Sequence, residues 1–343
     1  MTKALDLNYS TQSHSNVSFG YRMQIGAALS SMIGIPILCI LSGELNLLRL
    51  VFPVLSLAVG AFLLWRSKPL YVGLVFWLWF ITPLVGRIAG QQEAWTQGSA
   101  VALAPYITAG LAVIPPLSNL QCLRNRNTLP YVCALMGVLY GLVIGLRYLP
   151  LFNVLRALLN WIVPIVFGLF IYEYRRFYPQ FRKVIEKSFL LCLILTGAYG
   201  IYQFFALPEW DRIWMLNVEM NSFGEIDPMK TRVFSTMNAP AIFAAVMAFG
   251  LLLLFNIKGR LKLLAAACGF ISLTFTLSRA SWLSLALGCA FLAFRLGTRA
   301  RIRLAVSTLA CIAFLAGVMQ ISGVNEVIEE RVRTFMQPGQ DIS

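Results

Sequence analysis

Arg279 is the only charged residue in an otherwise apolar stretch of sequence, residues 263–294. A guanidinium group placed in hydrocarbon costs about 3 kcal/mol by insertion scales, and such residues are commonly functional. Arginine also offers a planar fork of N–H donors that matches the oxygens of a phosphate group. The residue type and its apolar setting together predict contact with an anionic group such as a phosphate.

A second arginine, Arg232, lies near the end of the longest polar connection in the chain, residues 207–236. The same connection carries the carboxylates Glu225 and Asp227, either of which could accept a proton from a hydroxyl group as a general base. We therefore regard these three side chains as candidates for one site.

Other arginines are weaker candidates for that site. Arg147 and Arg156 flank a short turn and could help to bind the same anion. For every arginine the alternative is an interface anchor, whose apolar stem lies in the membrane while its charge reaches the lipid headgroups. Arg49 and Arg87 are expected to be structural.

Several chemistries lack the residues that they need. His14 is the only histidine and lies in the polar N-terminal tail. We therefore expect neither a Ser–His triad nor a zinc site, and no other metal or cofactor. The cysteines have no metal-ligand or redox spacing. No Walker-type phosphate loop is present. No Asp or Glu falls in an apolar run, which counts against a transporter driven by protons or sodium ions.

The composition indicates a membrane protein. Of 343 residues, 59% are hydrophobic and 12% are charged, whereas soluble domains carry about 25% charged residues. Apolar runs long enough to cross a bilayer as helices recur along the chain. We expect an all-α, polytopic integral membrane protein with about 11 transmembrane helices, at 23–42, 47–65, 69–86, 99–118, 130–149, 153–172, 188–206, 237–255, 263–278, 280–294 and 304–322.

The distribution of basic residues predicts the topology. Most Lys and Arg residues fall in connections that share one side of the membrane with the N-terminus, so this side is cytoplasmic and the C-terminus is extracytoplasmic. The net charge of +14 arises from these connections, and no nucleic acid partner is expected. A continuous helix over 263–294 would put basic clusters on both sides. A hairpin with Arg279 at its outer turn avoids this, and places Arg279 on the same side as Arg232.

The expected organisation has three parts. Residues 1–22 form a polar cytoplasmic tail, and residues 23–322 form the multi-span membrane domain with its outer loop at 207–236. Residues 323–343 are expected to begin a further outer loop that is incomplete in this chain.

Two segments resemble the O-antigen ligase and O-antigen polymerase family, a group of bacterial lipid-linked glycan transferases. They are "TRVFSTMNAPAIFAAVMAFGLLLL" (231–254) and "LTFTLSRASWLSLALG" (273–288). The family has an Arg a few residues before a span that begins with Asn and Pro, and then a Ser-Arg turn before a span rich in small and aromatic residues. The matching positions are Arg232, Asn238, Pro240, Ser278 and Arg279.

The resemblance implies metal-independent transfer of an undecaprenyl-diphosphate-linked saccharide to a glycan or lipid acceptor. The reaction would occur at the outer face of the bacterial cytoplasmic membrane, in cell-envelope or exopolysaccharide biosynthesis. Arg232 and Arg279 would be catalytic and hold the diphosphate as it departs. Asn238 and Ser278 would help to bind the substrate.

The sequence departs from the family in two respects. Ser235 stands where the family commonly has Gly. The family also continues with a large outer loop, often bearing a functional His, and further spans, so this chain resembles a C-terminally truncated member. The general base would then be absent from this chain or supplied by Glu225 or Asp227.

Two alternatives from other classes remain open. A non-catalytic transporter or flippase of lipid-linked glycan could use the same arginines to bind a diphosphate headgroup. A structural membrane subunit would tolerate replacement of both arginines. The expected partners of the enzyme are the lipid-linked saccharide donor, its glycan or lipid acceptor and the membrane lipids.

Overall fold

The computed structural model describes residues 19–91, 100–118, 126–218 and 221–295. Within these ranges every regular element is a helix, apart from one isolated bridge between Gly224 and Thr231, so the expected all-α class is confirmed there. The α-helices are α1 (Phe19–Leu41), α2 (Leu45–Arg66), α3 (Lys68–Ala89), α4 (Ala104–Gly110), α5 (Ile114–Ser118), α6 (Leu129–Tyr148), α7 (Leu151–Glu173), α8 (Tyr178–Ala206), α9 (Glu209–Asn217), α10 (Pro240–Leu253), α11 (Leu261–Phe275) and α12 (Arg279–Arg295).

Six helical stretches among the described residues are long and apolar enough to cross a membrane, which indicates a multi-pass membrane protein. They are Met23–Leu41, Leu45–Arg66, Lys68–Ala89, Arg126–Tyr148, Leu151–Glu173 and Arg175–Ala206. Four shorter apolar stretches coincide with further predicted spans: Ala100–Pro116, Pro240–Asn256, Leu261–Phe275 and Arg279–Phe294. The complete set of spans and the sidedness of the termini stay predictions. The predicted span 304–322 and the segments 1–18 and 323–343 lie outside the described residues.

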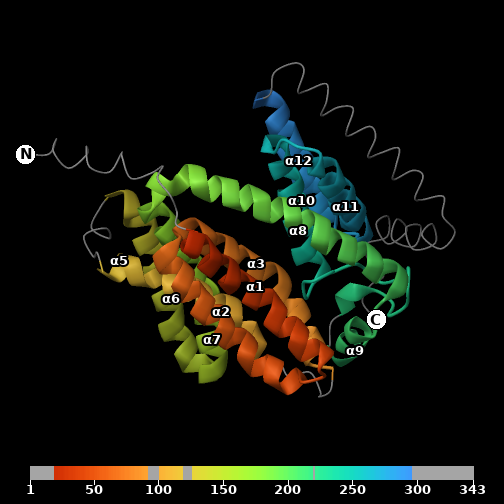
Figure 1. Cartoon of the computed structure of the whole chain (residues 1–343), viewed down its shortest axis with the longest axis horizontal. Coiled ribbons are helices and arrows are strands. Elements are labelled where there is room, and N and C mark those ends of the chain that lie inside the picture. Colours follow the sequence, from red (N-terminus) through yellow and green to blue (C-terminus); the bar gives the residue numbers. More distant parts are fainter. Residues whose placement is uncertain (1–18, 92–99, 119–125, 219–220, 296–343) are drawn as a thin grey trace, which may run out of the picture.

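The helix α8 runs between two groups of helices, with α1, α2, α3 and α7 on one side and α10, α11 and α12 on the other (Figure 1). Phe189 of α8 joins the two groups. Its ring centroid lies 5.2 Å from that of Phe80 on α3 and 5.1 Å from that of Phe249 on α10. Edge-to-face aromatic contacts of this kind stabilise packing beyond the burial of apolar area. The helix α8 therefore packs against both groups of helices and holds them together.

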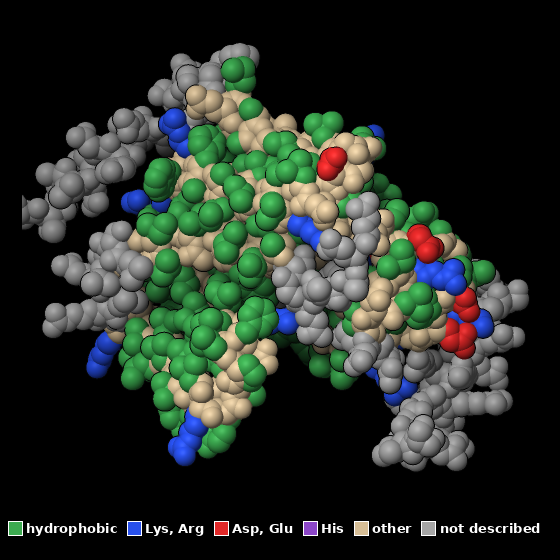
Figure 2. All heavy atoms as spheres, turned by 90° about the horizontal axis from the view of Figure 1, so that it is seen from below, with side chains coloured by type: hydrophobic (Ala, Val, Ile, Leu, Met, Phe, Trp, Pro, Cys, Tyr) green, Lys and Arg blue, Asp and Glu red, His purple; other side chains and the backbone are tan. Residues whose placement is uncertain are grey.

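The surface has the polarity expected of a membrane protein. Figure 2 shows a broad face of hydrophobic side chains. Asp and Glu side chains on this face lie toward the right, the end at which α9 is found in Figure 1, whereas Lys and Arg side chains lie at both ends and between them. We refer to the end that carries α9 as the loop end. By its contacts this end also includes the C-terminus of α3 and the segment leading into α10, which Arg87 joins to α9. The N-terminal part of α7 lines a cleft with Asn238 of that segment, and the turn before α12 is bound by Arg232.

The residues 276–278 separate α11 from α12, and the two helices double back as a hairpin. The rings of Phe270 and Trp282, on opposite sides of the break, lie 5.5 Å apart, whereas one straight helix would separate these positions by about 18 Å. Gly269 of α11 and Gly288 of α12 also pack against adjacent leucines near the C-terminus of α10, Leu251 and Leu252. The predicted hairpin is therefore confirmed, with Arg279 as the first residue of its second helix.

Glycine determines how closely α8 and α11 approach each other. A Cβ atom added at Gly197 would lie 2.9 Å from the backbone carbonyl of Cys268, closer than side chains tolerate. Gly137, Gly141 and Gly145 of α6 share a small-residue spacing that favours helix packing, and all three line the space between α6 and α7. A Cβ atom added at Gly145 would lie 3.5 Å from the side chain of Val154, whereas one added at Gly137 or Gly141 would meet nothing within 4 Å. Of the three positions, α6 and α7 therefore approach each other closely at Gly145 and leave a gap at the other two.

The exchange Gly197→Ala is expected to destabilise the protein by about 1–3 kcal/mol, because the added methyl group meets backbone and cannot be accommodated by a rotamer change. Thermal unfolding of the purified protein in detergent measures the effect. Gly141→Ala is the matched control, with a small or stabilising effect expected in a helix. Equal effects of the two exchanges would contradict the close approach of α8 and α11.

Candidate functional site

The most buried ion pair in the described residues joins Arg87 of α3 to Asp211 of α9. Arg87 Nε lies 2.8 Å from Asp211 Oδ1, and both side chains are fully inaccessible to solvent. The guanidinium also lies against the rings of Trp214 and Phe234, at 5.4 and 4.9 Å from their centroids. A charge removed from water in this way must be paired with an opposite charge and hydrogen-bonded, because its desolvation is otherwise too costly.

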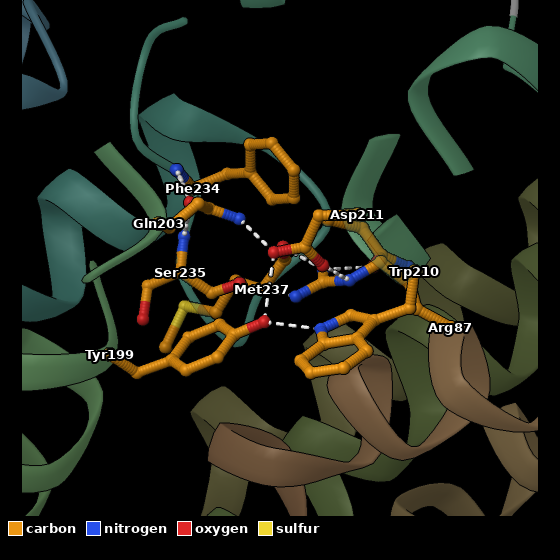
Figure 3. Close-up of polar contacts among 9 residues, drawn as sticks. Arg87, Tyr199, Gln203, Trp210, Asp211, Phe234, Ser235 and Met237 are labelled. Atoms are coloured by element: carbon orange, nitrogen blue, oxygen red, sulfur yellow. Dashed lines mark hydrogen bonds and ion pairs between the residues drawn. The ribbon is translucent and has the colours of Figure 1, made fainter. Parts of the chain in front are cut away.

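Arg87 also binds the chain segment 235–238, which leads into α10. It donates hydrogen bonds to the carbonyl oxygens of Ser235 and Met237 and, at 3.1 Å, to Oδ1 of Asn238 (Figure 3). Guanidinium groups only donate, and their rigid geometry suits several acceptors at once. The expectation that Arg87 is structural agrees with these contacts. Arg49 likewise donates to the carbonyl of Ala89, at 3.1 Å.

The other oxygen of Asp211 is held by two side chains of α8. Tyr199 donates to Oδ2 at 2.9 Å, and the amide nitrogen of Gln203 does so at 2.5 Å. The amide oxygen of Gln203 accepts the backbone N–H groups of Phe234 and Ser235, at 3.1 and 2.7 Å. Gln203 thus connects the buried carboxylate to the same segment that Arg87 binds from the other side (Figure 3).

Arg232 is held against the turn between α11 and α12. Its Nε donates to the carbonyl of Thr276 and its Nη2 to that of Leu277, at 3.1 and 3.4 Å, while Nη1 donates to Ser222 at 3.1 Å. The backbone N–H of Val233 also donates to the carbonyl of Phe275 at 3.0 Å, which joins the segment around Arg232 to the end of α11. The structure therefore brings the segment containing Arg232 directly onto the turn that ends at Arg279.

The turn itself is constrained by its backbone. Leu277 has a left-handed φ of 52°, and Ser235 has a φ of 51°, a region that strongly favours glycine and often marks functional sites when other residues occupy it. Ser278 is 6% exposed and its hydroxyl pairs with that of Ser281 at 3.1 Å, a contact at the start of α12. Its predicted role in substrate binding stays a prediction. The side chain of Arg279 is exposed.

A cleft of about 380 Å³ opens at the loop end between α3, α4 and α7, and it contains two of the predicted residues, Arg156 and Asn238. Tyr106 and Asn160 also line it, and the Tyr106 hydroxyl donates to Oδ1 of Asn160. Arg147 does not belong to the cleft. It is exposed at the end of α6, where its guanidinium lies 5.7 Å from the ring centroid of Tyr148.

The two predicted carboxylates lie at the surface. Glu225 forms an ion pair with Lys230 at 2.8 Å, in which both side chains are at least half exposed. Asp227 is exposed, and its backbone carbonyl accepts the hydroxyl of Thr231 at 3.0 Å. Their role as a general base stays a prediction.

Sequence reasoning missed Asp211, Gln203 and Tyr199 as members of the central network. Asp211 is one of several acidic residues in the connection 207–236, and the sequence contains no pattern that distinguishes it from the others. One usable signal was present, since a buried arginine at the end of a span needs a carboxylate nearby. Asp211 is the one that the helix α9 presents to Arg87.

In the described ranges, no group of three or more His, Cys, Asp or Glu side chains is placed to hold a metal ion. The arrangement offers instead arginine side chains at two places at the loop end, Arg232 and Arg279 at the turn 276–279 and Arg156 in the cleft. Comparisons with protein-family models, curated proteins and solved structures found no match for this chain.

Proposed function

We propose that this protein is a membrane glycosyltransferase of the O-antigen ligase or polymerase type, acting at the outer face of the bacterial cytoplasmic membrane. Its donor is a saccharide linked to undecaprenyl diphosphate, and its acceptor is a glycan or a lipid. The observation that carries the proposal is the docking of Arg232 onto the turn 276–278. The two segments that resemble the family thus meet where Arg232 contacts the turn that precedes Arg279.

The position of Arg279 suits a diphosphate. It opens α12, a helix of 17 residues, whose first N–H groups and positive dipole end favour an anion. The exposed guanidinium adds a full positive charge at the same place. The neighbouring Arg232 fixes the turn through its bonds to the carbonyls of Thr276 and Leu277. In this assignment Arg279 contacts the diphosphate, and Arg232 positions the turn and adds positive potential.

The left-handed backbone at Ser235 also supports the proposal. This is the position at which the family commonly has Gly, and a φ of 51° is one that glycine adopts most readily. Ser235 is held there by Gln203, which accepts its N–H, and its hydroxyl donates to the carbonyl of Thr196 at 2.5 Å. These contacts compensate for the conformational cost of a residue other than glycine.

The reaction places defined demands on the site. The acceptor hydroxyl oxygen bonds to the anomeric carbon, the bond from that carbon to the diphosphate oxygen breaks, and undecaprenyl diphosphate leaves with the bonding electrons. Cations placed in advance at the departing oxygens lower the barrier by stabilising this charge. The proton of the acceptor hydroxyl passes to a base, for which Glu225 and Asp227 are the candidates already named.

The proposal is tested with the purified full chain in detergent, together with undecaprenyl-diphosphate-linked oligosaccharide and acceptor extracted from the native host. The expected result is a covalent glycan–acceptor product with release of undecaprenyl diphosphate, detected by mass spectrometry. Tight binding of the donor without product, under conditions in which a control ligase is active, would reject the transferase and favour the transporter or flippase alternative.

A further inference from the structure

The cleft at the loop end, which contains Arg156 and Asn238, has the features of a site for an anionic lipid. Its walls are mainly apolar, from α3, α4 and α7, and its polar groups gather around Arg156 and Asn160. These two residues are four apart on α7 and so share one face of the helix. Binding pockets typically combine apolar walls with a few converging polar groups.

The amide groups in the cleft are oriented to donate. The Oδ1 atom of Asn160 accepts the hydroxyl of Tyr106, and the Oδ1 atom of Asn238 accepts Arg87. Because the oxygen of each amide is engaged in this way, its NH₂ group is what each side chain can offer to a ligand. With the guanidinium of Arg156, the polar part of the cleft is rich in donors, and donors with positive charge suit an anion.

A third observation points to a missing partner. Thr82 lines the cleft from α3 and is 2% exposed. Its hydroxyl has no hydrogen-bond partner among the described residues. A buried hydroxyl without a partner carries a desolvation cost that a bound ligand can relieve.

We infer that this cleft binds a phosphorylated lipid, with the phosphate at Arg156 and Asn160 and the hydrocarbon chain against the apolar walls. Arg156 is in the second turn of α7, about 8 Å along the helix from its first residue. A bilayer phospholipid and a polyprenyl phosphate share this chemistry. The inference does not rest on glycan transfer.

The test uses the delipidated full chain in detergent and native mass spectrometry of its lipid adducts. Dioleoyl-phosphatidylglycerol, undecaprenyl phosphate and inorganic phosphate are titrated separately. Both lipids are expected to bind, whereas inorganic phosphate, which lacks the chain, is expected to bind far more weakly. The lipid with the lower dissociation constant identifies the natural source. Adducts of inorganic phosphate as stable as those of the lipids would overturn the assignment to a lipid.

Variants locate the site. Arg156→Gln is expected to raise the dissociation constant for the lipid by about tenfold or more, because a charge-assisted bond to phosphate is lost. Asn160→Asp retains an acceptor for Tyr106 but replaces the donor by a negative charge, so it should weaken binding similarly. Arg147→Gln is the control, since Arg147 is a nearby exposed arginine outside the cleft.

The melting temperature of each variant is measured in the same detergent, and the exposed position of Arg156 predicts that it is unchanged. Unaltered lipid affinity in both cleft variants would overturn the inference, as would an equal loss in Arg147→Gln. None of these outcomes depends on whether the protein transfers a glycan, so the inference and the proposed function can fail separately.

Discussion

Replacing Asp211 with alanine is expected to lower the free energy of unfolding by about 3–5 kcal/mol, because the exchange leaves the charge of Arg87 buried without its counter-ion. Arg87 and Asp211 are fully inaccessible to solvent, so water cannot take over the lost contact. Tyr199 and Gln203 lose their acceptor on Asp211 in the same step. Equilibrium unfolding of the purified protein in mixed detergent micelles measures the effect.

The surface pair of Glu225 and Lys230 provides the matched control. It has the same separation of 2.8 Å but is at least half exposed, and exposed pairs contribute about 0–1 kcal/mol. Glu225→Ala should therefore change stability little. If Asp211→Ala proved as mild as Glu225→Ala, the buried pair would not organise the loop end.

A double exchange distinguishes the contribution of the Arg87–Asp211 ion pair from that of the hydrogen bonds between Arg87 and backbone carbonyls. Arg87→Met combined with Asp211→Leu removes both buried charges, which by itself is often neutral or stabilising. It also removes the donor for the carbonyls of Ser235 and Met237. The double variant should therefore recover only part of the stability lost in Asp211→Ala, and full recovery would show that the carbonyl contacts are unimportant.

Periodicity and charge predicted the helical elements well because apolar run length is a local property. The predicted spans 23–42, 47–65 and 69–86 correspond to α1, α2 and α3 within a few residues. The stretch 99–118 is less regular than expected. It contains α4 and α5 with 3₁₀ turns between and before them, and Pro115 and Pro116 lack the N–H donors that a continuous helix needs.

The contacts of the candidate site depend on tertiary structure and were only partly predictable. The hairpin at Arg279 followed from the charge on its flanks, and Arg232 was expected on the same face. The short helix α9 was not expected, because a nine-residue amphipathic segment inside a polar connection gives a weak signal. Without α9, the sequence could not indicate which carboxylate reaches Arg87.

The structure also changes the interpretation of Arg232. Sequence reasoning gave Arg232 and Arg279 the same task, direct contact with a diphosphate. Arg232 is half-buried and directs three of its N–H groups to backbone carbonyls, whereas Arg279 is exposed at a helix start. The two residues should therefore differ in how their replacement affects stability and activity.

The variant Arg279→Ala is expected to reduce glycan transfer by about 100-fold or more, the usual effect of removing a group that stabilises a departing anion. Its unfolding should match that of the wild type, because the side chain is exposed. Arg279→Lys retains the charge but not the bidentate geometry, so it should restore only part of the activity. Transfer is measured as glycan displayed by the native host lacking its own gene copy, and with purified components.

The variant Arg232→Ala should lose transfer and stability together, because the turn 276–278 loses its hydrogen bonds from the guanidinium. Each such bond contributes about 0.5–1.5 kcal/mol, so a measurable decrease in melting temperature is expected with the loss of product. Arg260→Ala is the control, because Arg260 is an exposed arginine that was predicted in no site, and it should retain both properties. Wild-type transfer in Arg279→Ala would reject its contact with the donor. Unchanged stability in Arg232→Ala would reject the positioning role of that residue.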